Sequence, residues 1–91
     1  MKNEYLFPAI FTPEENGISI EFPDLPGCLP CADTMEEAVK NATEALGLHL
    51  YGMEEDGEAI PNASRISDIH LPSGSTLCMI NVFMPAFREN I

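Results

Sequence analysis

The sequence predicts a small α+β domain in which one helix packs against an antiparallel sheet. Two short runs near the N-terminus alternate between apolar and other residues, as strands do, and an Asn-Gly turn separates them. A stretch with a clear helix start follows, and a second apolar run near the C-terminal end indicates a further strand. These observations predict the order strand, strand, short strand, helix, strand in a single domain spanning residues 1–91.

The first two strands are expected to form a hairpin with one buried face. Residues 5–11 alternate, and residues 18–22 carry their three apolar side chains on one side. Because Pro8 has no backbone N–H, the first strand is expected at a sheet edge, or with Pro8 at a bulge or on an unpaired side. A short third strand is expected around residues 28–32.

The connection after the hairpin is the best candidate for a binding surface. Pro23, Asp24, Leu25, Pro26 and Gly27 fix the backbone and predict a rigid, exposed loop with Leu25 as its only large apolar group. A loop that is already rigid loses little entropy on docking, and Asp24 could meet a basic group of a partner. The alternative is a tight connection that the fold itself demands.

The helix is expected to begin at Thr34, which forms a capping box with Glu37. Glu36 and Glu37 in its first turn are a second candidate contact with a partner, or simply a capped, solvated helix end. Gly47 weakens the last part, and Gly52 or Gly57 could end the helix. One apolar stripe is expected to face the sheet, formed by Met35, Ala38, Val39, Ala42, Ala45 and Leu46.

The C-terminal apolar run, residues 77–83, is apolar on both faces except for Asn81. Strands buried on both sides have this composition, so the run predicts a central strand of the sheet.

Charge restricts the class of partner. The chain carries 15 acidic and 4 basic residues, a formal net charge of −11, which repels nucleic-acid phosphates and attracts basic proteins. Solubility alone is the competing explanation. No run is long enough to span a membrane, no signal peptide is evident, and three cysteines fit a reducing compartment, so we expect a cytoplasmic protein.

Several segments together resemble the HicB family of bacterial antitoxins. The likeness is carried by Phe22-Pro23-Asp24-Leu25-Pro26-Gly27-Cys28, Asp33-Thr34, Glu36-Glu37-Ala38 and Asn41-Ala42, with Tyr5, Pro8-Ala9, Asn16-Gly17, Leu50, Gly57 and Pro61 around them. The resemblance implies a partial ribonuclease H-like fold and an antitoxin that masks a small, basic HicA-type toxin cleaving messenger RNA. It also implies that operator DNA is bound only through a further C-terminal segment, which residues 87–91 do not supply.

The competing enzymatic hypothesis is a metal-dependent nuclease on a ribonuclease H-like sheet. It would need carboxylates converging on two metal ions, and Glu21, Asp24, Asp33 and Glu44 are the available acids. Fold likeness alone transfers no such site, so we expect a protein that is not an enzyme.

Cysteines and histidines offer weaker alternatives. Cys28 and Cys31 have the spacing of a redox pair, but the loop around them lacks the context of one. Together with Cys78, His49 and His70, these cysteines do not form any known zinc-binding spacing. The two histidines also lack the serine, cysteine or carboxylate partners of a hydrolytic triad. No catalytic, cofactor or metal site is therefore expected. An unpaired sheet edge would allow a homodimer or a higher homo-oligomer.

Overall fold

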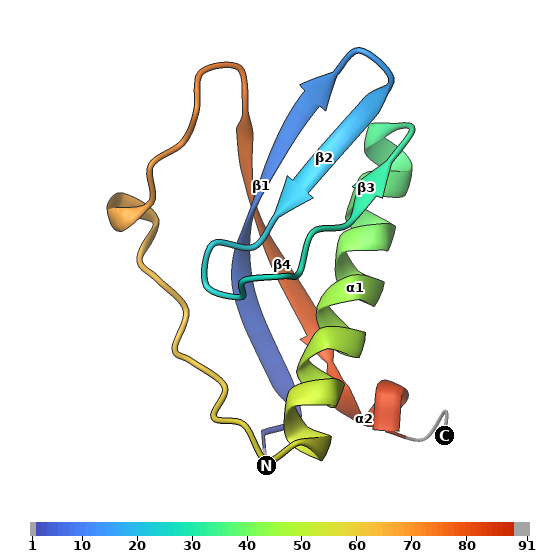
Figure 1. Ribbon diagram of the computed structural model, residues 1–91, viewed down its shortest axis with the longest axis vertical. Helices are drawn as coiled ribbons and strands as arrows, with labels where there is room; N and C mark the ends of the chain where they lie inside the picture. Colours follow the sequence, from blue (N-terminus) through green and yellow to red (C-terminus); the bar gives the residue numbers. More distant parts are fainter. Residues whose placement is uncertain (1, 89–91) are drawn as a thin grey trace.

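A computed structural model describes residues 2–88, which fold into one sheet covered on one face by a long helix (Figure 1). The strands are β1 (Glu4–Glu14), β2 (Gly17–Glu21), β3 (Cys31–Ala32) and β4 (Thr76–Phe83), and the helices are α1 (Met35–Glu55), the short 3-10 turn η1 (Ile66–Asp68) and α2 (Met84–Arg88). The strand order is β3-β2-β1-β4, with every neighbouring pair antiparallel. The α+β fold and its predicted order of elements are confirmed. Within the described residues, no helix combines the length and apolarity needed to cross a membrane.

The core lies between α1 and the inner face of the sheet. Alternation in β1 directs Phe7, Ala9 and Phe11 toward the helix, and Ile18 and Ile20 of β2 join them. The hairpin therefore buries one face, as predicted. Small side chains on α1 let the helix lie close to the sheet, and its buried side consists of Ala38, Ala42, Leu46, Gly47 and Leu50.

Pro8 does not place β1 at an edge. β1 lies between β2 and β4, and Pro8 is opposite Met79 of β4. The ladder with β2 begins only at Ile10, so β2 has no residue opposite Pro8. The missing N–H therefore faces no ladder partner in β2, which is how a strand inside the sheet tolerates this proline.

β4 is an edge strand, and the expectation of a central strand was wrong. It pairs with β1 from Thr76 to Phe83 and ends the strand order. Its inward side chains Ile80 and Val82 are buried, whereas outward Met79 is 39% exposed. β4 therefore carries more apolar side chains than α1 covers.

The start of α1 shows the Thr34 half of the predicted capping box, and its end lies near Gly57, one of the two glycines predicted to end it. The Thr34 hydroxyl accepts a hydrogen bond from the backbone N–H of Glu37 at 3.2 Å. The helix ends at Glu55, and Gly57 adopts the left-handed φ of +71° that glycine permits. A Cβ on Gly47 would collide with the Phe87 ring of α2, so a larger residue here would have to displace that ring.

The predicted helix stripe needs one correction. Met35 and Val39 are each 47% exposed, and the buried side continues instead to Leu50. Both side chains lie in the first two turns of α1.

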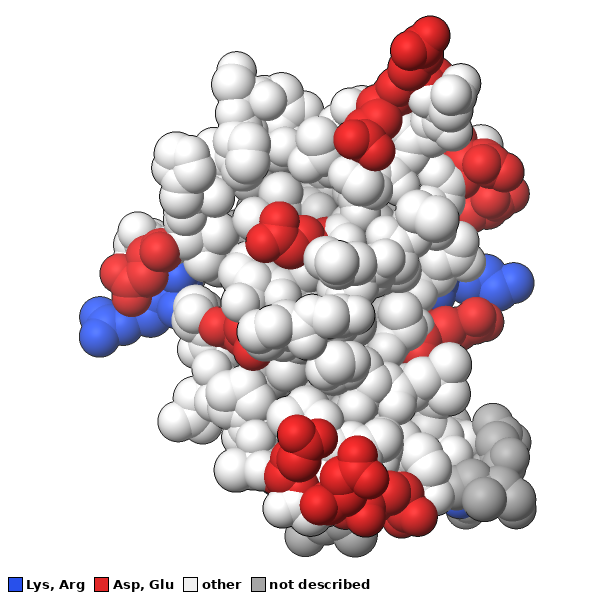
Figure 2. Space-filling model, viewed as in Figure 1, with Lys and Arg blue, Asp and Glu red and all other residues white. Residues whose placement is uncertain are grey.

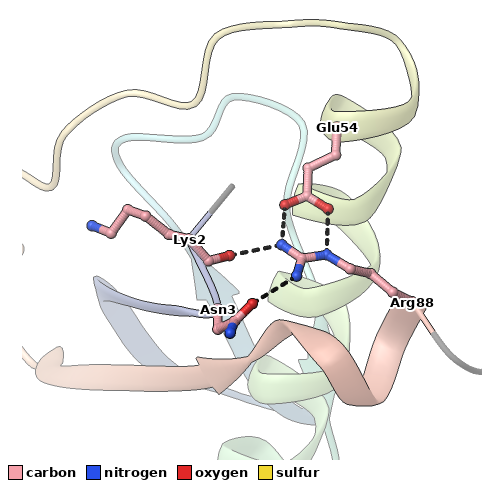
Figure 3. A network of polar contacts seen from close by, with 4 residues as sticks. All are labelled: Lys2, Asn3, Glu54 and Arg88. Atoms are coloured by element: carbon pink, nitrogen blue, oxygen red, sulfur yellow. Dashed lines mark hydrogen bonds and ion pairs between the residues drawn. The ribbon is translucent and has the colours of Figure 1, made fainter.

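Arg88 of α2 ties the two chain ends to α1 (Figure 3). Its Nε and Nη2 donate to the Glu54 carboxylate at 3.0 and 2.7 Å, and the same guanidinium donates to the Asn3 side chain and the Lys2 carbonyl. The Glu54 side chain is only 6% exposed. Hydrogen bonds from Arg88 lower the pKa of Glu54, against burial, which alone would raise it.

The Glu54–Arg88 pair should make stability depend on pH in a defined window. The pKa of Glu54 in the folded protein lies below its unfolded value of about 4.3. The ionised carboxylate therefore adds its full contribution to the free energy of unfolding above about pH 4.3, and this contribution is lost as the pH falls through the folded pKa. Glu54→Gln should lower the free energy of unfolding at pH 7 by about 1.5–3 kcal/mol. Urea unfolding of both proteins from pH 7 to pH 3 measures this, and a difference that stays constant with pH would contradict the assignment.

Candidate functional site

The connection between β2 and β3 consists of two successive tight turns. The backbone N–H of Leu25 donates to the carbonyl of Phe22 at 3.0 Å, and that of Cys28 donates to the carbonyl of Leu25 at 3.1 Å. Proline is the second residue of each turn, and Gly27 supplies the positive φ of +91° at the third position of the second turn. These two hydrogen-bonded turns are the local arrangement on which the predicted rigidity of residues 23–27 would depend.

The two turns send every third side chain inward. Phe22, Leu25 and Cys28 are 1%, 2% and 4% exposed and belong to the core. The expectation that Leu25 is an exposed apolar group was therefore wrong. Of the predicted contact residues in this loop, Pro26 and Gly27 are exposed, and Pro23 and Asp24 are half-buried.

Cys28 is a packing residue. Its thiol donates a long hydrogen bond, 3.7 Å, to the carbonyl of Ala45 in α1, and burial raises the pKa of the thiol. A redox pair needs a thiol with a lowered pKa, so this environment argues against that chemistry. Cys31, in β3, is exposed, and both are free thiols.

Asp24 holds the loop to a distant segment. Its Oδ2 accepts from the backbone N–H of Ser64 at 3.0 Å, and its Oδ1 accepts from the Ser64 hydroxyl. The carboxylate expected to meet a partner therefore already fixes the segment between α1 and η1. One role does not exclude the other, because a carboxylate offers about four lone-pair sites.

Beside this loop, the surface is hollowed along one side of α1. A hollow of about 590 Å³ lies between the loop, the second half of α1 and the segment after it, and a second of about 440 Å³ lies further along the loop. Leu48 and His49 line both. We call these two hollows together the α1 groove; its lining is Asp24, Leu25, Pro26, Gly27, Cys28, Leu29, Pro30, Ala45, Leu48, His49, Gly52, Met53, Asp56, Glu58, Ala59 and Pro61.

Leu48 is the central apolar feature of the α1 groove. It lies two residues from both Leu46 and Leu50, so it projects about 200° around the helix from the buried side. It is 64% exposed, and Leu29 opposite it on the loop is 68% exposed. Leu48 was not predicted as a contact residue. The sequence does contain an indication of it, because Leu48 is a leucine on the otherwise polar side of α1.

Acidic residues border the α1 groove. Asp24, Asp56 and Glu58 are part of its lining, and Glu44 lies one helical turn before Leu48 on the same side. Lysine and arginine are absent from its described lining. On the face shown in Figure 2, acidic side chains far outnumber basic ones and cluster where α1 ends. The groove thus combines the exposed apolar side chains of Leu29 and Leu48 with a negative border.

The structure does not bring all predicted contact residues together. Glu36 and Glu37 are exposed in the first turn of α1, about 12 Å along the helix from Ala45, the nearest helical residue of the groove lining. They extend the acidic surface but do not line the groove.

The nuclease alternative gains no support from the arrangement of acids. Among residues 2–88, no three histidine, cysteine, aspartate or glutamate side chains are placed to hold a metal ion. Glu21, Asp24, Asp33 and Glu44 therefore do not converge. His49 lines the α1 groove and His70 is exposed.

Comparison with known proteins identifies the family. The model of the HicB-like antitoxin of bacterial toxin–antitoxin systems matches residues 7–87. The chain belongs to the HicB-like antitoxin family. Antitoxin HicB 1 of Photorhabdus laumondii is 35% identical over 83 residues, 86% of this chain and 54% of that protein. An uncharacterised 14.9 kDa protein of Haemophilus phage HP1 is 39% identical over 61 residues, 67% of this chain and 46% of that protein.

Solved structures share this fold. A toxin–antitoxin complex from Streptococcus pneumoniae matches with a TM-score of 0.83 and 18% identity, covering 92% of this chain and 72% of that one. The N-terminal domain of the Burkholderia pseudomallei antitoxin HicB matches with a TM-score of 0.70 and 23% identity, covering 84% and 95%. The chain spans about half the length of the curated relatives it matches.

Truncation of Leu25 should destabilise the domain far more than truncation of its exposed neighbour. Leu25→Ala removes a side chain that is 2% exposed and should lower the free energy of unfolding by about 2–5 kcal/mol. Leu29→Ala, the control, should stay within about 0.5 kcal/mol. Equal effects in urea unfolding would mean that the loop is not anchored in the core.

Loss of the Asp24 carboxylate should release the segment around Ser64. Asp24→Asn leaves one oxygen to accept where two now do, so the Ser64 amide should exchange with solvent about tenfold faster. Amide exchange followed by NMR measures this, with the amides of α1 as the internal control. Unchanged exchange at Ser64 would show that the segment is held by other contacts.

Proposed function

We propose that this chain is the toxin-binding part of an antitoxin and that it neutralises a small, basic, HicA-type toxin by covering its RNA-cleaving surface. The observation that carries the proposal is membership of the HicB-like antitoxin family over residues 7–87, together with an acid-bordered apolar groove. One structural relative is named as the HicA3 and HicB3 toxin–antitoxin complex; it matches with a TM-score of 0.70 and 24% identity, covering 86% of this chain and 98% of that one.

The α1 groove is the surface we propose for the toxin. Its loop is rigid, so little conformational entropy is lost on docking. Leu29 and Leu48 expose large apolar side chains on its two sides, where contact with a partner would remove them from water. Pro23, Asp24, Leu25, Pro26 and Gly27 then act mainly by shaping this surface, with Pro26 and Gly27 as direct contacts.

The acidic surface supplies attraction. A formal net charge of −11 steers a basic toxin toward the chain and raises the rate of encounter more than the final affinity. Glu36 and Glu37, at the far end of α1, contribute in this way. The same charge disfavours contact with nucleic acid, so binding of operator DNA would depend on a segment outside these 91 residues.

In this proposal the chain is not an enzyme: it acts by occupying a surface and transforms no substrate. Such a partner places it in the cytoplasm, which suits its free thiols. The oligomeric state of the antitoxin is a separate question that the toxin surface does not decide.

A charge placed in the α1 groove should weaken toxin binding. Leu48→Lys replaces an exposed apolar side chain of the groove with an ammonium that faces a basic partner, and it should raise the Kd by at least about tenfold, with loss of protection in a toxin RNA-cleavage assay. Val39→Lys on the same helix, 47% exposed and outside the groove, makes the same charge change and should keep the Kd within about threefold.

Calorimetric titration with a HicA-type toxin gives both values. An equal increase in Kd for the two variants would show that the toxin responds to the net charge of the chain and not to the groove. An unchanged Kd for Leu48→Lys would show that the groove is not part of the interface. Absence of any binding by the unmodified chain would overturn the proposed function itself.

A further inference from the structure

The segment between α1 and β4 forms one side of the α1 groove and is held at few points. Figure 1 shows it beside the sheet as an extended chain that is interrupted only by η1. The backbone N–H of Glu58 donates to the carbonyl of Met53 at 2.9 Å, and Ser64 donates to Asp24. Between these two points, residues 59–63 make no hydrogen bond with any other part of the described chain. We call residues 59–63 the groove wall.

A second hollow lies on the other side of the groove wall. It has a volume of about 230 Å³ and is lined by Lys2 and residues 5–7 on one side and by residues 60–63 on the other. Pro61 lines both this hollow and the α1 groove. The ladder between β1 and β2 begins only at Ile10, so β2 does not fill the space beside the first half of β1. The groove wall therefore separates two hollows and has room to move away from the α1 groove.

Apolar burial favours this movement, and the contacts of Ser64 oppose it. Ile60 is only partly buried against the core, and Leu6, which also lines the second hollow, is 49% exposed. Movement of the wall into the hollow would bring these two side chains together and remove apolar surface from water. Asp24 cannot follow, because the buried side chain of Leu25 holds its loop in the core. The two hydrogen bonds between Ser64 and Asp24 therefore restrain the wall.

We propose that Ser64 is a positioning residue for toxin binding. Through Asp24 it keeps the groove wall forward, where Ala59 and Pro61 complete the α1 groove, and loss of this restraint lets the wall move into the second hollow. This role rests on the proposed function and assigns a part in it to a residue that does not itself line the groove. A wall that moves leaves only a fraction of the molecules with a complete groove, and the apparent Kd rises as that fraction falls.

Removal of the Ser64 hydroxyl tests the positioning role without changing the groove lining. Ser64→Ala should raise the Kd for a HicA-type toxin about fivefold in calorimetric titration. Ser64→Thr keeps the hydroxyl and should stay within about twofold of the unmodified chain. Ser67→Ala is the matched control, because it makes the same substitution at an exposed serine of η1, and it should also stay within about twofold. Circular dichroism checks the fold of each variant.

Filling the second hollow should compensate for the lost restraint. Leu6→Trp enlarges a side chain that lines the hollow from β1, so it blocks the space into which the wall would move. Combined with Ser64→Ala, it should return the Kd to within about twofold of the unmodified chain, and alone it should leave the Kd unchanged. General destabilisation by Ser64→Ala would not be reversed by a residue on the far side of the wall.

Nuclear Overhauser effects between the methyl groups of Ile60 and Leu6 report the wall without any toxin, and they should be stronger in Ser64→Ala than in the unmodified chain. Unchanged effects would overturn the movement. An unchanged Kd in Ser64→Ala, an equal increase in Ser67→Ala, or no recovery in the folded double variant would each overturn the positioning role and leave the proposed function intact. Absence of binding by the unmodified chain would overturn the proposed function and the positioning role together.

Discussion

The burial of Phe22, Leu25 and Cys28 under α1 is the constraint on which the rest of the structure depends. Two linked turns direct these three side chains into the core, so the loop backbone is held against the helix. Its exposed residues then stand beside Leu48, and Asp24 is placed to hold the segment that closes the α1 groove. The same packing that stabilises the domain therefore builds the surface proposed for the toxin.

Charge divides the molecule into two kinds of surface. Acidic residues occupy the hairpin end, α1 and the segment after it, whereas β4 and α2 contain none among their described residues. A basic protein is attracted to the first surface.

Local patterns in the sequence predicted the elements well and the site only in part. Alternation, the Asn-Gly turn and the Thr34 cap are signals within a few residues, so the strands and the helix start were found. The direction of Leu25 depends on two consecutive turns, and the exposure of Leu48 beside a hollow depends on residues 56–61 folding back. The edge position of β4 depends on which strands complete the sheet. The apolar composition of β4 shows that the strand can be buried, but it does not show where in the sheet the strand lies.

Mapping the toxin footprint on the isotope-labelled chain tests the central claim most directly. Chemical-shift changes and cross-saturation on addition of unlabelled toxin should concentrate in residues 24–30, 45–53 and 56–61, with β4 unaffected. That pattern would place the partner on the groove built by the buried loop. A footprint centred on β4, or one confined to the first turn of α1, would contradict the account.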